Sequence, residues 1–150
     1  MKIEIIRLNN THPDPLPLPK YGSDGAAGLD LQAEIDEPIL LDPGERALVS
    51  SGIAINLGDS ALVAKMYVRS SIGHKHGIVL SNGTGIIDSD YQGPIGMSLY
   101  NTSNKPFVIQ RGDRIAQLVI SPVLQVSLKE CTEFSSATKR GVGGFGSTGT

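Results

Sequence analysis

The sequence predicts an all-β fold, and two observations lead to that prediction. Short apolar or alternating runs recur along the 150 residues between turn residues, and no segment keeps a helical period for about ten residues or more. The 18 glycines and 9 prolines exceed average usage, whereas aromatic residues make up only 5%. Many short strands joined by turns are typical of a jelly-roll-like distorted barrel or sandwich.

The predicted elements follow one another at short intervals. Residues 12–20 contain four prolines, which exclude helix and central strand and predict a stiff exposed connector. Residues 70–77 are too short and glycine-flanked for more than one helical turn, and Gly52 indicates a bulge or bend. Residues 61–68 are apolar nearly throughout, as expected for a strand buried on both faces. The predicted strands are residues 2–7, 29–31, 38–41, 46–57, 61–68, 77–80, 95–100, 105–110, 114–123 and 125–129.

Composition excludes several classes of protein. Hydrophobic content of 39% and charged content of 19% indicate one globular domain. A net charge of −2 and a single cysteine, Cys131, argue against a general nucleic-acid binder and a disulfide framework. The N-terminus has no long apolar region, and no run approaches about 18 apolar residues. We therefore expect a cytoplasmic protein that does not insert into membranes.

Residues 82–93 (NGTGIIDSDYQG) are the first candidate for chemistry. Asn82-Gly83 between apolar residues is a strong hairpin signal. One interpretation is a solvated hairpin with acidic turn residues. The other places Asp88, directly after two isoleucines, as a base on a pocket wall with the ring of Tyr91 beside it.

Two further segments suit anions. Arg69, Ser70 and Ser71 follow a predicted strand, so a guanidinium, two hydroxyls and backbone N–H groups can converge on an anion there. Alternatively, Ser70 is the N-cap of a short helix and Arg69 is a surface charge. Gln117 is a lone polar residue in the apolar run IAQLVI, and it either hydrogen-bonds structurally or lines a site.

The C-terminal residues 140–150 are unusual for a flexible linker. Phe145 lies between glycines and Arg140 precedes them, so the segment could stack on a planar base and grip phosphate. It lacks the lysine of a P-loop. Beyond residue 135 the chain is polar and glycine-rich and could reach a neighbouring molecule.

Three other signals are discounted. His74 and His76 lack further metal-ligand partners, so a surface position is expected. The tripeptide at residues 111–113 (RGD) is better explained as a turn before a strand. Cys131 has no basic neighbour in sequence.

Five ordered segments resemble the trimeric dUTPase family, bacterial type: AAGLDLQA (26–33), RSSIG (69–73), GIIDSDYQG (85–93), RGDRIAQL (111–118) and RGVGGFGST (140–148). The resemblance implies a homotrimer of jelly-roll subunits, with a core at residues 1–134 and a flexible tail at 135–150 that closes an active site between subunits. It implies hydrolysis of dUTP to dUMP and pyrophosphate with Mg²⁺. That reaction supplies dUMP for thymidylate synthesis and keeps uracil out of DNA.

The resemblance also implies roles for individual residues. Asp88 would be the general base for the water that attacks the α-phosphate. Tyr91 would exclude a 2′-hydroxyl, and Phe145 would stack on uracil. Asp30 would contact Mg²⁺ through water or support a neighbour, with no direct protein ligand expected. The substrate-binding set would be Arg69, Ser70, Ser71, Gly73, Asn82, Gly85, Ile86, Ile87, Tyr91, Gly96, Gln117, Arg140, Phe145, Gly146, Ser147 and Thr148, with Gly96 acting through its backbone.

The chain departs from the family pattern at Val68, where proline is usual, and at Ser71, where glycine is frequent. Both departures concern the rigidity of the phosphate loop. Two alternatives are a dCTP deaminase-like enzyme of the same fold, which would need a glutamate near the base, and a non-catalytic nucleotide-binding β trimer.

Overall fold

The computed structural model describes residues 1–9, 12–144 and 147, and within them it forms eleven strands and one short helix. The all-β prediction is therefore confirmed. The elements are β1 (Glu4–Arg7), β2 (Leu29–Gln32), β3 (Ile39–Leu41), β4 (Arg46–Ser50), β5 (Ile53–Asn56), β6 (Leu62–Val68), α1 (Ser70–His76), β7 (Ile78–Leu80), β8 (Gly85–Ile87), β9 (Gly96–Asn101), β10 (Phe107–Ile109) and β11 (Arg114–Pro122).

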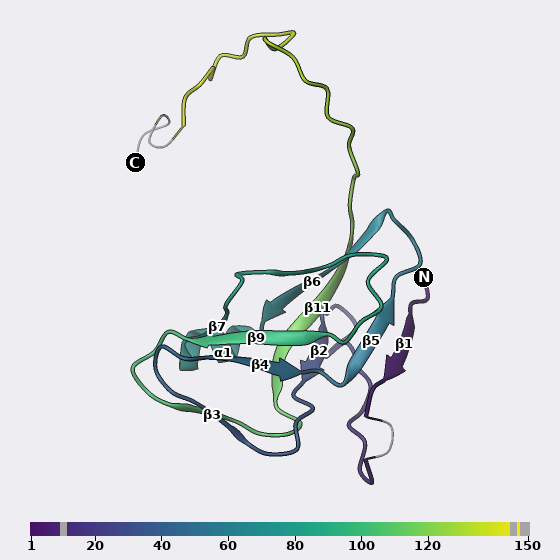
Figure 1. The fold of residues 1–150 in the computed structure, drawn as a ribbon, viewed down its shortest axis with the longest axis vertical. Helices are drawn as coiled ribbons and strands as arrows, with labels where there is room; N and C mark the ends of the chain where they lie inside the picture. Colours follow the sequence, from purple (N-terminus) through teal and green to yellow (C-terminus); the bar gives the residue numbers. More distant parts are fainter. Residues whose placement is uncertain (10–11, 145–146, 148–150) are drawn as a thin grey trace.

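The strands form four antiparallel sheets (Figure 1). The largest has the order β2-β11-β6-β8, and a three-stranded sheet has the order β4-β9-β7. Two-stranded sheets pair β1 with β5 and β10 with β3. Among the described residues these sheets are not closed into a barrel, so the sandwich form of the prediction fits better.

The core lies where side chains from the sheets meet. Strand β9 alternates strictly between half-buried and buried residues, which is the period expected when one face of a strand is covered. Leu31 on β2, Val49 on β4, Leu99 on β9 and Ile115 on β11 are completely buried. Each such aliphatic side chain contributes roughly 1.5–3 kcal/mol through burial.

Strand β6 is buried on both faces only over its first half. Leu62, Val63 and Ala64 are buried, whereas Lys65 is half-buried and Tyr67 is 38% exposed. The expectation for residues 61–68 therefore holds for the first half of the strand. The second half turns a side chain to the surface next to the start of α1.

Three sequence predictions about elements were wrong or incomplete. Helix α1 has seven residues, about two turns, and ends at Gly77 in the left-handed conformation. Gly52, with φ of 70°, divides residues 46–57 into β4 and β5, which belong to different sheets. Residues 125–129 form no strand, because the chain leaves the sheet after Pro122 and meets no strand edge.

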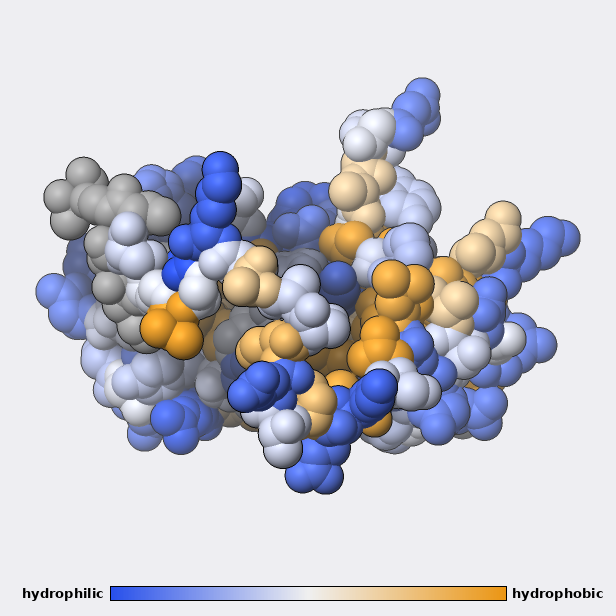
Figure 2. All heavy atoms as spheres, turned by 90° about the horizontal axis from the view of Figure 1, so that it is seen from above, coloured by the Kyte–Doolittle hydropathy of each residue, from blue (hydrophilic) through white to orange (hydrophobic). Residues whose placement is uncertain are grey.

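The segment beyond β11 is exposed and extends away from the sheets (Figure 1). It keeps an apolar alternation, yet Leu124 is 89% and Leu128 is 93% exposed. Figure 2 looks onto the side from which this segment leaves and shows apolar side chains exposed there among hydrophilic ones. Exposed alternating apolar residues are typical of a segment that packs against another chain.

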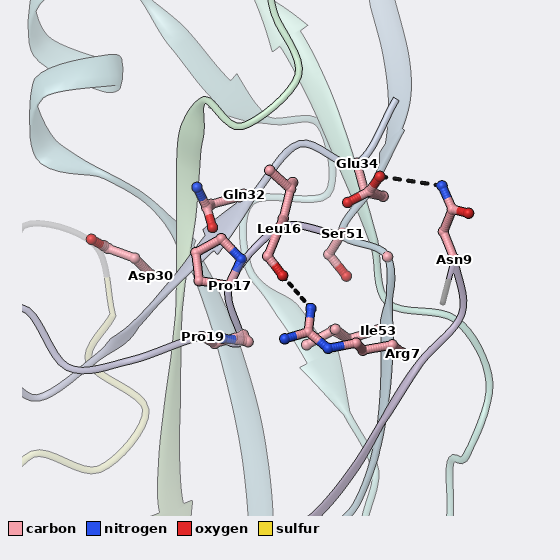
Figure 3. A pocket seen from close by; sticks show the side chains of 11 residues that line it. Arg7, Asn9, Leu16, Pro17, Pro19, Asp30, Gln32, Glu34, Ser51 and Ile53 are labelled. Atoms are coloured by element: carbon pink, nitrogen blue, oxygen red, sulfur yellow. Dashed lines mark hydrogen bonds between the residues drawn. The ribbon is translucent and has the colours of Figure 1, made fainter. Parts of the chain in front are cut away.

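The proline-rich connector is held to the sheets by a hydrogen bond from Arg111, which is itself fixed by an ion pair with Glu34. Arg111 donates from Nε and Nη2 to one oxygen of Glu34, at 3.0 and 2.9 Å, and from Nη2 to the carbonyl of Asp14 at 2.8 Å. Figure 3 shows the adjoining pocket, where Arg7 donates to the carbonyl of Leu16. This pocket holds about 20 Å³, room for a single water. The arginine of the RGD tripeptide is thus occupied structurally, which agrees with discounting that motif.

Asn101 is a fully buried polar residue that organises the turn after β9. Its amide nitrogen donates to the carbonyls of Leu41 at 2.9 Å and Lys105 at 2.8 Å. Its carbonyl oxygen accepts from the backbone N–H of Ser103 at 2.9 Å and from the Ser103 hydroxyl at 2.8 Å. All polar atoms of the side chain are therefore satisfied, as burial requires.

We predict that Asn101→Leu lowers the free energy of unfolding by about 2–4 kcal/mol, because it leaves several buried polar groups without partners. Urea denaturation followed by circular dichroism measures this change. Asn104→Leu is the matched control, since Asn104 is exposed in the same turn. A loss below about 1 kcal/mol for Asn101→Leu would contradict the role given to these hydrogen bonds.

Candidate functional site

The turn at Asn82 and Gly83 is formed as predicted, but the hairpin is not. Gly83 has φ of 74° and donates its backbone N–H to the carbonyl of Leu80 at 3.0 Å. However, β7 before the turn pairs with β9, and β8 after it pairs with β6. The turn therefore carries the chain from one sheet to the other. Ser81 fixes its start by donating a backbone N–H to the carbonyl of Ser98 at 2.8 Å.

A pocket of about 240 Å³ lies beside this crossing. It brings together seven residues that the sequence analysis singled out: Asn82, Gly85, Ile86, Ile87, Asp88, Tyr91 and Gly96. Met66, Pro94 and Ile95 also line it and were missed by sequence reasoning. Met66 comes from the neighbouring β6, where it pairs with Gly85 in the register. A pocket of this size suits part of a nucleotide rather than a whole one.

Gly85 allows the close approach of β8 to β6. A Cβ atom at this position would lie 2.9 Å from the Cβ and 3.0 Å from the Cε of Met66. A larger residue would therefore push Met66 into the pocket or separate the strands. Gly85 therefore keeps the pocket open.

Asp88 follows directly after β8 and is exposed at the edge of the pocket. Among the described residues, its carboxylate takes part in no ion pair and no hydrogen bond. Both oxygens are consequently available to water or a ligand. This position is compatible both with a solvated acidic turn residue and with a base on a pocket wall.

Tyr91 also lines the pocket and is 46% exposed. Its hydroxyl donates to the carbonyl of Pro94 at 2.9 Å, and its backbone N–H donates to the carbonyl of Asp88 at 3.2 Å. The second bond closes a turn at residues 88–91.

A second cluster of charged residues forms around Asp30 on β2. One Asp30 oxygen contacts Nε of Arg69 at 3.0 Å, and the other contacts Nη1 of Arg114 at 3.1 Å. The side chains of Asp30 and Arg69 are 19% and 29% exposed, whereas that of Arg114 is 56% exposed. Two guanidiniums on one carboxylate leave a net positive charge, which favours an anionic ligand.

Arg114 was not singled out as a site residue from the sequence. It lies in the segment RGDRIAQL, but only the strand register places it near Asp30, since Arg114 pairs with Gln32 on β2. The alternative in which Ser70 is the N-cap of the helix is wrong. Arg69 occupies that position and makes no side-chain capping bond, and Ser70 and Ser71 lie in the first turn.

Gln117 belongs to the same cluster. It pairs with Asp30 on one side and with Tyr67 on the other, and directly opposed residues of antiparallel strands share a face. A Cβ atom at Gly28 would lie 2.7 Å from Oε1 of Gln117, so the amide group rests on that glycine. Gln117 is half-buried and therefore lines the face that carries the charged residues.

Asp88 and Arg69, one charged residue from each of the two clusters, lie far apart within one chain. Ile87, just before Asp88, pairs with Ala64 near the start of β6, whereas Arg69 follows the end of that strand. The five residue steps from Ala64 to Arg69 correspond to roughly 17 Å at about 3.3 Å per residue. Arg69 also reaches toward β2, on the side of β6 opposite to β8. One chain therefore does not bring the two clusters into one pocket.

The tail residues are described only in part. Arg140 is exposed and donates from Nε to the carbonyl of Gly143 at 2.9 Å, within a turn at residues 138–143. The backbone N–H of Ser147 donates to the carbonyl of Gly144 at 3.1 Å. The predicted site residues Phe145, Gly146 and Thr148 lie outside the described residues. Within its described part, the tail forms no hydrogen bond or ion pair with either cluster.

The discounted residues occupy structural or surface positions. His74 and His76 are exposed on α1, and the ring of His76 packs on that of Phe107 with centroids 5.0 Å apart. Cys131 is exposed. Among residues 1–9, 12–144 and 147, no group of three or more His, Cys, Asp or Glu side chains could hold a metal. The helix found in this part of the chain is too short and polar to span a membrane.

Comparison with known proteins gives consistent matches over nearly the whole chain. The dUTPase family model matches residues 14–149. The deoxyuridine 5'-triphosphate nucleotidohydrolase of Hahella chejuensis is 53% identical over 135 residues, which cover 90% of this chain and 88% of that protein. The enzyme of the same name from Alcanivorax borkumensis is 48% identical over 149 residues, or 99% of each chain.

Solved structures agree with these sequence matches. The dUTPase of Staphylococcus bacteriophage 80alpha, in complex with dUpNHpp, has a TM-score of 0.84 at 26% identity, covering 99% of each chain. A mutant dUTPase from phage phi11 of S. aureus, described with a structural Mg(II) ion, has a TM-score of 0.79 at 23% identity and shares the fold. It covers 91% of this chain and 100% of that one.

Proposed function

The chain belongs to the dUTPase family and hydrolyses dUTP as a dUTP diphosphatase, and on that premise we propose how its residues bind and cleave the substrate. The observation that carries the proposal is the division of the candidate residues into two clusters. One is a pocket sized for a base and sugar, with a free carboxylate at its edge. The other is the cluster of Asp30, Arg69 and Arg114, which we call the cationic face. Its net positive charge suits phosphates.

Asp88 acts as the general base. It accepts a proton from a water, whose oxygen attacks the α-phosphorus in line. The bond from the α-phosphorus to the bridging oxygen breaks, and pyrophosphate leaves while dUMP remains. The free carboxylate at the pocket edge supports this role, since a base must reach its water directly.

The pocket binds the nucleoside part. Asn82 and the backbone of residues 85–87 contact the uracil edge, and Gly96 contributes through its backbone. Tyr91 packs against the deoxyribose and leaves no space for a 2′-hydroxyl. The dCTP deaminase alternative would need a glutamate at the base, and the described lining of this pocket contains none.

The cationic face binds the phosphates. Arg69, Ser70, Ser71 and Gln117 contact them, and Asp30 holds the guanidinium of Arg69 in place through the 3.0 Å ion pair. Gly73 lies in helix α1 together with Ser70 and Ser71 and contacts the substrate through its backbone.

Mg²⁺ is the cofactor that the family implies. This ion prefers oxygen ligands, keeps several waters and is usually bound through substrate phosphates and one or two carboxylates. Asp30 fits a contact through water, because one of its oxygens is already paired with Arg69 and the other with Arg114. Bound to the triphosphate, the ion would neutralise developing negative charge.

The active sites lie between subunits of a homotrimer, so that the pocket of one chain meets the cationic face of another. The separation of roughly 17 Å along β6 supports this arrangement, since a base at the α-phosphorus and an arginine on the phosphates must be close together. The exposed apolar residues of the segment after β11 support a reach to a neighbour.

Residues 135–150 form a tail that closes the site over bound substrate. Phe145 stacks on uracil, and Arg140, Gly146, Ser147 and Thr148 bind the outer phosphates. The core is residues 1–134. The enzyme supplies dUMP for thymidylate synthesis and keeps uracil out of DNA, and we place it in the cytoplasm, where its nucleotide substrate is used.

Pyrophosphate release from dUTP, UTP, dTTP and dCTP, measured side by side, tests the substrate assignment. We predict release from dUTP at a kcat/KM far above that for the other three nucleotides. Comparable rates for dCTP or UTP would contradict it, and so would ammonia release from dCTP.

We predict that Asp88→Asn keeps dUTP binding but lowers kcat by at least about 10²-fold, because the amide cannot accept the proton of the attacking water. Binding of dUTP is measured by calorimetry and turnover by pyrophosphate release. Asp90→Asn is the matched control, since it removes an exposed carboxylate two residues away. Near-normal turnover of Asp88→Asn would refute the role of Asp88.

We predict that ending the chain after Lys139 abolishes most activity while the trimer and its melting temperature remain nearly unchanged. The described part of the tail makes no hydrogen bond or ion pair to the core, and ordering the tail costs about 1–2 kcal/mol per residue, so only bound triphosphate stabilises the closed form. Deletion of residues 149–150 alone is the control. Full activity of the longer truncation would contradict tail closure.

A further inference from the structure

We propose that Gly93 is a positioning residue for substrate selectivity, because its missing side chain provides the space in which the ring of Tyr91 lies. The inference rests on the proposed function, in which Tyr91 excludes the 2′-hydroxyl. It adds a determinant outside the pocket lining, since Gly93 is not among the residues that line that pocket.

The contact between Gly93 and Tyr91 is very close. A Cβ atom at Gly93 would lie 2.6 Å from the hydroxyl oxygen of Tyr91, 2.7 Å from Cζ and 3.0 Å from Cε2. Distances below 3.0 Å are shorter than van der Waals contact, so even alanine would displace the ring. Glycine is therefore required here for space.

Backbone conformation does not explain the glycine. Gly93 is not among the residues with positive φ, so its backbone can be adopted by alanine without the strain of the left-handed region. Gly83, in the turn at the other end of the segment, does have a positive φ. Gly93→Ala therefore changes the space under the ring and little else.

The backbone at residues 94 and 95, next to the Tyr91 ring, is fixed by hydrogen bonds. Ile95 donates its backbone N–H to the carbonyl of Ile53 at 2.9 Å. The carbonyl of Ile95 accepts from the backbone N–H of Ser51 at 3.1 Å and from its hydroxyl at 2.6 Å. These bonds fix the backbone after Pro94, whose carbonyl accepts the Tyr91 hydroxyl at 2.9 Å.

The ring is held less firmly than this backbone. Tyr91 is 46% exposed, and among the described residues its side chain makes one hydrogen bond, to Pro94. A side chain added at Gly93 would consequently shift the Tyr91 ring rather than the backbone of residues 94 and 95. Because the ring is proposed to be the wall that the sugar meets, its displacement changes the space available to a 2′-hydroxyl.

We predict that Gly93→Ala folds normally and lowers the ratio of kcat/KM for dUTP to kcat/KM for UTP by at least about tenfold, the scale set by one misplaced methylene-sized group in a pocket. Steady-state pyrophosphate release with both nucleotides measures the ratio. Gly22→Ala is the matched control, since a Cβ there meets nothing within 4 Å. It should leave the ratio unchanged.

A double-mutant cycle with Tyr91→Ala separates a positioning role from a general structural one. If Gly93 acts through Tyr91, then Gly93→Ala changes the ratio by less than about twofold once the ring has been removed. An equal loss in both backgrounds would overturn the inference.

The cycle also separates a failure of the role proposed for Gly93 from a failure of the role proposed for Tyr91. If Tyr91→Ala lowers the ratio but Gly93→Ala does not, only the inference about Gly93 is overturned. If Tyr91→Ala leaves the ratio unchanged, the steric role of Tyr91 falls as well. Should Gly93→Ala fail to fold, Gly93→Ala in the Tyr91→Ala background decides: recovery of folding supports the contact with the ring, and failure to fold there as well overturns it.

Discussion

The pairing of β6 along both of its edges determines where the functional residues lie. Strand β8 pairs with residues 64–66 in the middle of β6, and Asp88 follows β8 toward the start of β6. Strand β11 pairs with the other edge and, together with β2, assembles Asp30 and Gln117 on the far side. Arg69 follows the end of β6 and turns toward Asp30. The same strand therefore holds both halves of the proposed site and keeps Asp88 apart from Arg69.

Close contacts made possible by glycines give each half its shape. Gly85 lets β8 approach Met66 at the pocket, Gly28 leaves room for the amide of Gln117, and Gly93 leaves room for the ring of Tyr91. In each case an added Cβ would lie within 3.0 Å of a neighbouring side-chain atom. The high number of glycines indicated turns in the sequence. Some of these glycines also allow close packing at the site.

Local patterns in the sequence predicted most strands, and the family resemblance supplied most of the residues that line the pocket, which lie close together along the chain. Prediction from the sequence failed where the outcome depends on partners distant in sequence. Asn82-Gly83 specifies the turn but not which strands pair beside it. Residues 125–129 alternate like a strand but have no edge to join within one chain. Arg114 and Met66 reach their clusters only through the strand register.

The central claim is that a complete site needs two chains, and mixing two inactive variants tests it directly. Arg69→Ala removes the phosphate contact and Asp88→Asn removes the base, each on a different chain. If the site is shared, mixed trimers regain about a quarter of wild-type activity, since a random pairing gives both intact residues in about one site in four. A mixture that stays as inactive as its parents, although native mass spectrometry shows mixed trimers, would contradict the claim.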